Sequence, residues 1–465
     1  MINRRRILSV LGALPAAGLA YQSPTPAKAA GHLPQRVLGR TGRWVVPYAF
    51  GGQASVQRTP DGIDPVDIVV RAVEQGINYL DTANGYGPSQ VNFGQAFRRL
   101  KLRPHETGYD AALRERIFLA TKTGRRFAHA PGVAGPTAVE ELRRSLTQMF
   151  GDGEGFIPEG AYLDSIQIHN LSTMEQVEQV YQGYNERGGK MPEQIGALAA
   201  LIDYRDGTNY TGLNPERKKW VRHLGITGHL SSPVLMNAIQ RDTGDHLDTM
   251  LIALNANDRA YGAHQYNAIP AARAKGMGII AMKIFSDGTF YGKEARFSRN
   301  AADTYVQVGK AGAVDAADLV RYPLGVAGVS CAIVGIGKID RANAEKDQLV
   351  TNMTAALDGT VSDSEMLAIE KRVRARHGLD TNYFQDRHGL KQPTDVKAVK
   401  DGDRVRVTWQ TAFAGAEPIR TYDILAGGKK LASVPFRPQL TLEPLEFFVP
   451  AAEAGNGEIR VVAVA

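Results

Sequence analysis

The sequence predicts an α/β protein: a closed (β/α)8 barrel of the TIM type, followed by a small all-β immunoglobulin-like sandwich. Three observations support this. Between about residues 36 and 375, short apolar runs alternate with stretches of helical period. After about Asp380 the pattern changes to period two, as in Arg404-Val405-Arg406-Val407-Thr408-Trp409. A chain of 465 residues also has room for one large domain and a smaller one.

Eight apolar runs are candidate strands, and this number suits a closed barrel. An open, doubly wound sheet is the alternative that the same alternation allows. The candidate strands are Val45–Phe50, Asn78–Asp81, Ile117–Thr121, Ser165–His169, Arg222–Gly225, Leu251–Asn255, Gly278–Met282 and Cys331–Val334. Amphipathic helices are expected between them, among them Pro65–Gln75, Ala138–Phe150, Ser232–Gln240 and Ile269–Lys275.

The first 29 residues have the pattern of an export signal. Asn3-Arg4-Arg5-Arg6-Ile7-Leu8-Ser9 resembles the twin-arginine (Tat) signature, and Ala27-Lys28-Ala29 has the small-x-small form of a cleavage site. An ordinary basic helix start and a retained membrane anchor are alternatives, although the apolar run is shorter than the roughly 20 residues of a membrane span. We therefore expect a mature chain that is periplasmic or otherwise exported by a twin-arginine-type route.

Four segments follow from these patterns: a signal peptide over 1–29, a barrel over 30–380, a polar linker over 381–392 and a sandwich over 393–465. Further strands of the sandwich are expected at Thr421–Ala426, Lys430–Val434 and Glu458–Val464. This last domain resembles a fibronectin type III domain in Pro393–Val396, Val407–Trp409 and Glu417–Tyr422. Carbohydrate or cell-envelope contact through it is a hypothesis from that resemblance alone.

Charge and cysteine content exclude several classes of function. The formal net charge is +7, and it would be +3 without residues 1–29; no basic cluster is interleaved with aromatic residues, so we expect no nucleic-acid partner. The lone Cys331 lies in an apolar run and is expected in the core. No cysteine or histidine cluster has the spacing of a metal site, so we expect neither zinc nor an iron–sulfur cluster.

Four residue types that can polarise a carbonyl group stand at or just after predicted strand ends. The ordinary pKa of a tyrosine is about 10, so Tyr86 needs a nearby cation to donate a proton near neutral pH. Lys122 can supply that charge, and Asp81 can hold the ammonium in place. His169 offers an N–H group to the same substrate oxygen. These residues are the expected catalytic group, with Tyr86 as the general acid or base.

The segment from about Val37 to Leu349 resembles the aldo-keto reductases. The resemblance rests on Asp81-Thr82-Ala83-Asn84-Gly85-Tyr86-Gly87, on the strand ends Thr121-Lys122 and Asp164…His169, and on His223–Thr227 and Gly278–Lys283. It implies a (β/α)8 barrel with a nicotinamide cofactor across the strand ends. It also implies that Asp81, Tyr86, Lys122 and His169 form the catalytic tetrad.

The cofactor residues are expected around the last strand and near two others. In this family the adenosine phosphate binds by the last strand and the next helix, which here points to Gly335, Gly337, Lys338 and Arg341. Backbone N–H groups at a helix start bind phosphate, and the two basic side chains favour the 2′-phosphate of NADP(H), with NAD(H) as the alternative. The nicotinamide end is assigned to Thr227 and Asn255, and Lys283 is a further candidate for binding the cofactor.

The nicotinamide contacts depart from the family pattern. Thr227-Gly228-His229 replaces the usual Ser-Asn, and the sequence from Asn255 to Arg259 lacks the usual tyrosine pattern. Gln90 stands where a glutamate is common. His229 and His264 are as consistent with surface loops as with the site.

The sequence thus predicts hydride transfer between NADP(H) and a small carbonyl or alcohol, with a sugar-like substrate as one option. Export suggests a tightly bound cofactor that is recycled within one catalytic cycle, because the exterior has no evident supply of reduced nicotinamide. The alternative is a non-catalytic, cofactor-sensing or partner-binding protein of the cell envelope. Two long connections, from Asn170 to Arg222 and from Lys283 to about Val314, are expected to build the substrate pocket.

Overall fold

Eight parallel strands close into a barrel, so the open-sheet alternative is wrong. The computed structural model describes residues 33–309, 312, 314–455 and 457–465; the predicted export signal lies outside these ranges. Around the barrel the strand order is β10-β11-β12-β3-β4-β5-β7-β9. The strands are β3 (Tyr48–Gly51), β4 (Tyr79–Asp81), β5 (Phe118–Thr123), β7 (Leu163–Ile168), β9 (Val221–Gly228), β10 (Leu247–Ala253), β11 (Gly278–Met282) and β12 (Val329–Gly335).

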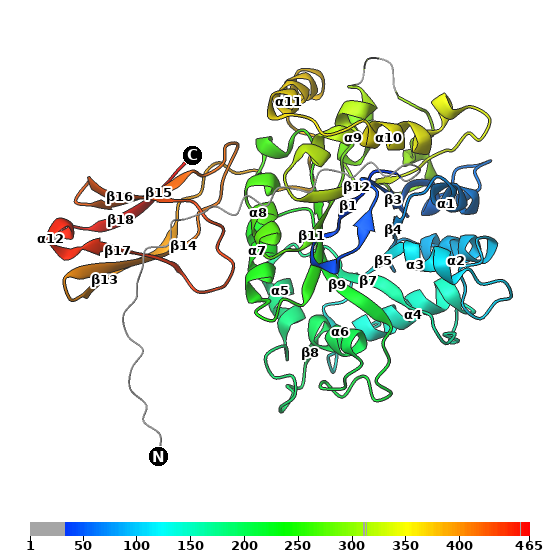
Figure 1. The fold of residues 1–465 in the computed structure, drawn as a ribbon, viewed down its shortest axis with the longest axis horizontal. Helices are drawn as coiled ribbons and strands as arrows, with labels where there is room; N and C mark the ends of the chain where they lie inside the picture. The colour runs from blue at the N-terminus through cyan, green and yellow to red at the C-terminus, as the bar shows by residue number, and fades with distance from the viewer. Residues whose placement is uncertain (1–32, 310–311, 313, 456) are drawn as a thin grey trace.

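Helices surround the barrel, and local sequence explains where several of them begin (Figure 1). The first helix follows Asp64, whose carboxylate accepts a hydrogen bond from the Val66 amide at 2.9 Å. A reciprocal capping box between Thr137 and Glu140 starts another. The helices are α1 (Pro65–Glu74), α2 (Ser89–Arg99), α3 (Ala111–Arg116), α4 (Ala138–Phe150), α5 (Met174–Tyr181), α6 (Ala197–Asp206), α7 (Ser232–Arg241), α8 (Ala268–Ala274), α9 (Ala316–Gly325), α10 (Gln348–Leu357) and α11 (Asp363–His377).

A short hairpin closes the amino end of the barrel. It consists of β1 (Arg36–Val37) and β2 (Trp44–Val45), and its buried Leu38 and Val45 pack with the side chains that fill the barrel interior. The Arg40 amide donates to the carbonyl oxygen of Gly276, just before β11 begins. A second small pair, β6 (Phe127–His129) and β8 (Ile195–Gly196), lies outside the barrel. The carboxyl end of the barrel is therefore the end left for a site.

The C-terminal region forms two antiparallel sheets around a core of its own. One sheet contains β13 (Thr394–Asp401), β14 (Arg404–Gln410) and β17 (Leu445–Pro450); the other contains β15 (Thr421–Ala426), β16 (Lys429–Pro435) and β18 (Ile459–Val464). A short helix, α12 (Ala451–Ala454), follows β17. The buried Trp409 packs against Tyr422 with ring centroids 5.4 Å apart, so the two sheets share one core. Strands β13 and β17 add to the four expected strands.

Buried hydrogen bonds join this domain to the barrel beside α7 and α8 (Figure 1). The Asn267 side chain, at the start of α8, donates to the Ala414 carbonyl oxygen at 3.0 Å and accepts from the Ala414 amide at 2.8 Å. The Gln240 amide of α7 donates to the carbonyl oxygen of Gln439 at 3.0 Å. Hydrogen bonds of this kind favour one orientation of the C-terminal domain on the barrel, because a shift of the domain would leave buried amide groups without partners.

The first residues of the connection between the two domains are buried at the carboxyl end of the barrel. The sequence predicts a polar linker over 381–392, but Thr381, Asn382, Phe384 and Gln385 are buried. Asn382 exchanges hydrogen bonds with the Asn255 side chain, just beyond β10. The polar composition that suggested a linker here provides partners for the polar groups beyond the strand ends.

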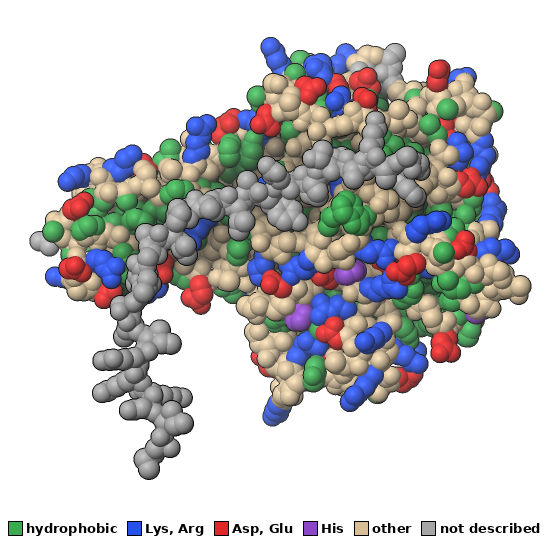
Figure 2. Space-filling model, viewed as in Figure 1, with side chains coloured by type: hydrophobic (Ala, Val, Ile, Leu, Met, Phe, Trp, Pro, Cys, Tyr) green, Lys and Arg blue, Asp and Glu red, His purple; other side chains and the backbone are tan. Residues whose placement is uncertain are grey.

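Basic and acidic side chains are interspersed over the barrel face that Figure 2 shows. Within the described ranges, no helix combines the length and the apolar character needed to cross a membrane.

Candidate active site

The four predicted catalytic residues meet at the carboxyl ends of three neighbouring strands. Asp81 is the last residue of β4, Lys122 lies in β5 and His169 follows β7, while Tyr86 stands in the loop after β4. Asp81 and Lys122 are 2 % and 1 % exposed and form an ion pair. The Lys122 ammonium also donates to the Thr82 carbonyl oxygen at 2.9 Å.

The tyrosine lies directly against this ion pair. The Lys122 Nζ atom is 4.7 Å from the centroid of the Tyr86 ring. The Tyr86 and His169 rings meet edge to face, with centroids 5.8 Å apart and an interplanar angle of 80°. Tyr86 and Asp81 both line a cavity, so the phenol is positioned between a cation and open space.

Burial alone would lower the pKa of Lys122, but the carboxylate of Asp81 and the phenol of Tyr86 outweigh it and raise that pKa. The Gln167 side chain donates to the second oxygen of Asp81 at 3.1 Å and so keeps the carboxylate satisfied. The lysine thus stays charged beside Tyr86, which is the condition for proton transfer by a phenol.

His169 is held neutral. Burial, followed by the positive charges of Lys122, Arg126 and Lys283, lowers its pKa from 6.5 to about 3. Arg126 also donates to the His169 carbonyl oxygen at 2.8 Å. A neutral imidazole can offer its N–H group to a substrate oxygen without competing with the tyrosine for the proton.

The depressed pKa of His169 predicts a stability that falls with acidification. Below pH 6.5 the unfolded chain takes up a proton that the folded chain refuses until about pH 3. In that window His169 should cost about 1.4 kcal/mol of unfolding free energy per pH unit. Denaturant unfolding of the parent and of His169→Gln at several pH values tests this. In the variant, unfolding free energy should depend less steeply on pH, by about 1.4 kcal/mol per pH unit, which corresponds to one proton. Equal slopes would contradict the assignment.

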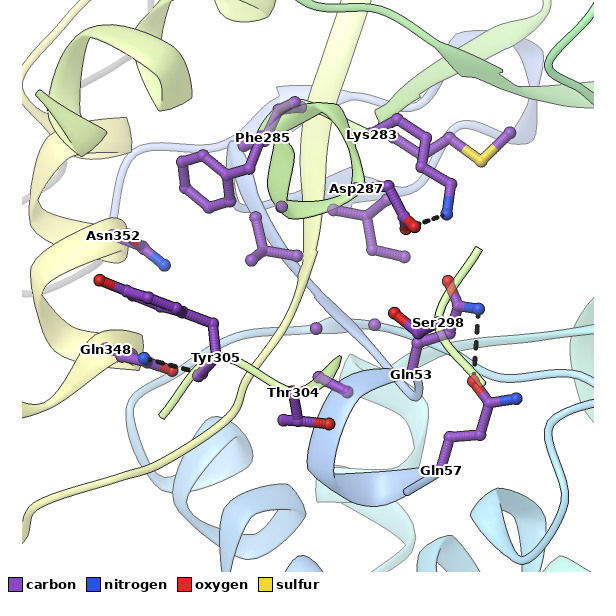
Figure 3. Close-up of a pocket in the computed structure, with 18 of the residues that line it drawn as sticks. Gln53, Gln57, Lys283, Phe285, Asp287, Ser298, Thr304, Tyr305, Gln348 and Asn352 are labelled. Atoms are coloured by element: carbon purple, nitrogen blue, oxygen red, sulfur yellow. Dashed lines mark hydrogen bonds and ion pairs between the residues drawn. The ribbon is translucent and has the colours of Figure 1, made fainter. Parts of the chain in front are cut away.

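A cavity of about 280 Å³ runs from Tyr86 towards the start of α10. Figure 3 shows side chains of several elements converging on it. Lys283, just after β11, donates to Asp287 at 2.7 Å and faces the opening. Gly51, Gly52, Gly288, Gly309 and Gly335 also line it, so backbone is exposed where an elongated ligand would lie.

Hydrogen bonds on both sides of the cavity hold residues 304–307, which follow Phe297 in the chain. The Thr304 hydroxyl donates to the Arg58 carbonyl oxygen at 3.3 Å. On the other side, the Gln348 side chain donates to the carbonyl oxygens of Tyr305 at 3.1 Å and Gln307 at 2.7 Å. Figure 3 shows Gln348 and Tyr305 meeting in this way.

Of the predicted cofactor residues outside the last strand, only one is brought to the cavity. Lys283 lines it. The buried Thr227 hydroxyl accepts from the Asn170 amide at 2.8 Å. Asn255 donates to Asn382 and to the carbonyl oxygen of Lys283, and thereby holds the inter-domain segment rather than the described cavity wall.

The predicted phosphate residues around the last strand are divided in the same way. Gly335 lines the cavity. The amides of Gly337 and Lys338 both donate to the Gln348 side-chain oxygen, while the Lys338 side chain is exposed. Arg341 pairs at 2.7 Å with both Asp67 and Glu74 of α1, so its guanidinium ties the loop to that helix.

Two histidines that the sequence leaves open as surface residues are buried. His264 is fully buried, and its Nδ1 atom shares a hydrogen bond of 2.7 Å with the Ser232 hydroxyl. His229 is 8 % exposed and pairs with Asn170, the residue after His169, at 2.7 Å. Burial, then the charge of Lys283, lowers the pKa of His229 well below its ordinary value. Its position two residues beyond Thr227 was the signal that could have placed it here.

The chain is similar to known proteins in sequence and in fold. The model of the Aldo/keto reductase family matches residues 49–358. A 6-dehydroglucose reductase of Novosphingobium aromaticivorans is 38% identical over 90 residues, which are 19% of this chain and 29% of that protein. A D-arabinose 1-dehydrogenase of Saccharomyces cerevisiae is 24% identical over 188 residues, 40% of this chain and 43% of that protein. The matches thus span less than half the length of either relative.

Among solved structures, an aldo-keto reductase of Bombyx mori in complex with NADP is similar in fold. The two share 16% sequence identity with a TM-score of 0.47, over 74% of this chain and 94% of that one.

Proposed function

Since the chain belongs to the aldo/keto reductase family, we propose that it is an NADP(H)-dependent oxidoreductase that interconverts a carbonyl group and an alcohol. The observation that carries the proposal is the placement of Tyr86, which lines the cavity, against the Asp81–Lys122 ion pair and the neutral His169. The relatives named for 6-dehydroglucose and D-arabinose favour a sugar-like substrate.

The cavity fits an elongated dinucleotide. It extends from Tyr86 to Gln348 and Asn352 of α10, its wall is rich in glycine, and Lys283 provides a cation. The exposed Lys338 stands just beyond β12 and is available to a 2′-phosphate, which favours NADP(H) over NAD(H). The reduced nicotinamide, when bound there, supplies the hydride.

The protein's own residues manage the proton. In reduction, the Tyr86 hydroxyl gives its proton to the carbonyl oxygen as the carbon–oxygen double bond becomes single, and the resulting phenolate is stabilised by the Lys122 ammonium. The neutral His169 donates a hydrogen bond to the same oxygen. In oxidation of an alcohol the tyrosine takes the proton back.

We further propose that the cofactor is held tightly and is recycled within one catalytic cycle, after export by a twin-arginine-type route. The N-terminal sequence pattern supports the export. The ties of the segment 304–307 to Arg58 and Gln348 support slow release, because they must break before a ligand beneath that segment can leave.

One experiment tests both parts. The purified protein, after denaturation, should release NADP(H) in a near-equal molar amount. In the native protein, an aldose or simple aldehyde should oxidise the bound NADPH once, followed by the nicotinamide absorbance, and continued turnover should need an alcohol that returns the hydride to the bound cofactor. A cofactor-free protein with weak NADP(H) affinity would remove the recycling proposal. Absence of turnover with either nucleotide over the whole panel would instead favour a non-catalytic, cofactor-sensing protein.

A further inference from the structure

The loop after β11 presents a half-exposed aromatic ring at the wall of the cavity that contains Tyr86. Phe297 is 49 % exposed, although it lines that cavity. An aromatic ring that is exposed at the wall of a cavity and held in a fixed position offers its face to a bound ligand.

Three contacts fix the position of this ring. The Lys283 Nζ atom lies 5.2 Å from the centroid of the Phe297 ring. The rings of Tyr383 and His229 meet it edge to face, with centroids at 5.2 and 6.0 Å and interplanar angles of 81° and 82°. Edge-to-face pairs are favourable beyond their buried area, so the ring is held in place without being covered.

Tyr383 connects this ring to the inter-domain segment. Its hydroxyl donates to Asp287 at 2.8 Å, and Asp287 also binds Lys283 at 2.7 Å and Lys293 at 3.0 Å. Phe384, the next residue, packs against His229 with centroids 6.1 Å apart. The segment that leads to the C-terminal domain therefore supports the exposed ring from behind.

Polar groups stand beside the ring on the side of the tetrad. His229 pairs with Asn170, which directly follows His169. Because the Asn170 side-chain oxygen accepts, His229 carries its proton on Nδ1, and its Nε2 atom is an acceptor without a partner among the described residues.

We propose that Phe297 is the stacking surface for the ring of a sugar substrate, and that Asn170 and His229 bind the hydroxyl groups of that sugar. A sugar ring has an apolar face of C–H groups and a rim of hydroxyls, and this surface matches both. An apolar carbonyl compound would leave the polar groups unsatisfied. The inference rests on the proposed oxidoreductase function and names the substrate class and the residue that selects it.

The test uses Phe297→Leu, which keeps an apolar side chain but removes the ring, and Phe297→Trp, which keeps a ring. The substrates are pentoses and hexoses, whose closed ring is oxidised at the anomeric hydroxyl by NADP⁺ to the lactone. For these sugars, Phe297→Leu should raise KM by about tenfold and change kcat little, and Phe297→Trp should stay within about threefold of the parent. Turnover of glyceraldehyde, which is too short to cover the ring, should be unchanged in both. The matched control is Phe156→Leu. Phe156 is 50 % exposed, and its one ring contact among the described residues is with His105, which lies outside the site.

Three results would overturn the proposal while leaving the proposed function intact. An unchanged aldose KM in Phe297→Leu would show that the ring is not used. An equal loss for glyceraldehyde would point to a general disturbance of the site. A matching loss of NADPH affinity, measured by nucleotide fluorescence, would assign Phe297 to the cofactor. Failure of the parent protein to turn over any carbonyl compound would instead overturn the proposed function.

Discussion

Replacing Tyr86 with phenylalanine should lower kcat by about 10²- to 10⁴-fold and leave KM and NADPH affinity nearly unchanged. The substitution removes one oxygen atom, the proton donor. It keeps the ring that packs against His169 at 5.8 Å and lies 4.7 Å from the Lys122 ammonium, so the site should keep its shape. Steady-state kinetics on the best substrate of the panel measures the effect.

The control for this variant is Tyr305→Phe, which removes a phenol from the same cavity. The Tyr305 hydroxyl donates to a backbone carbonyl oxygen of its own loop, that of Gly309, so its loss should alter kcat by less than about threefold. If Tyr86→Phe kept a tenth or more of the parent activity, the proton donor would have to be another group.

Replacing Lys122 with methionine should cost about 3–5 kcal/mol of unfolding free energy and abolish turnover. The change leaves the Asp81 carboxylate buried, and the Gln167 amide is then its remaining side-chain donor among the described residues. The double variant Asp81→Asn/Lys122→Met removes both charges and should recover most of the stability but none of the activity. Denaturant unfolding and turnover, measured on the same preparations, separate the two effects.

The exposed Lys429 in β16 provides the comparison for a lysine-to-methionine change as such. Lys429→Met should alter stability by less than about 0.5 kcal/mol. A Lys122→Met protein as stable as this control, or a double variant no more stable than Lys122→Met, would show that the ion pair does not determine the stability of the site.

The meeting of the four tetrad residues could be predicted from the sequence because each one lies near or beyond the carboxyl end of a strand. Once parallel strands close into a barrel, their carboxyl ends meet, and residues such as Asp81, Lys122 and His169 must come together whatever the loops do. The prediction needs only the position of each strand end, and short apolar runs mark those positions well.

The surrounding contacts could not be predicted, because they depend on partners distant in the sequence. Arg341 has the charge expected of a phosphate ligand, but Asp67 and Glu74 of the first barrel helix lie opposite it and bind it. Asn255 has the polarity of a nicotinamide contact, but Asn382 reaches it from beyond the last barrel helix. No local pattern shows which of two possible partners a polar side chain will find.

The missed strand β13 has a related cause. Its side chains are exposed along almost its whole length, so it lacks the alternation of buried and exposed residues that marks β14. Its place is set by backbone pairing with β14, which a hydropathy pattern does not record.

The burial of Asn382 at the barrel mouth affects how this protein can be divided for study. A shortened chain ending at the last residue of α11 would contain every barrel strand and all four tetrad residues. It would nevertheless lack the amide that holds Asn255, and it would lack Tyr383, which contacts the Phe297 ring, and Phe384, which contacts His229. Its kinetics would describe a damaged substrate site, so the catalytic domain in the biochemical sense extends past the barrel and includes residues up to about Gln385.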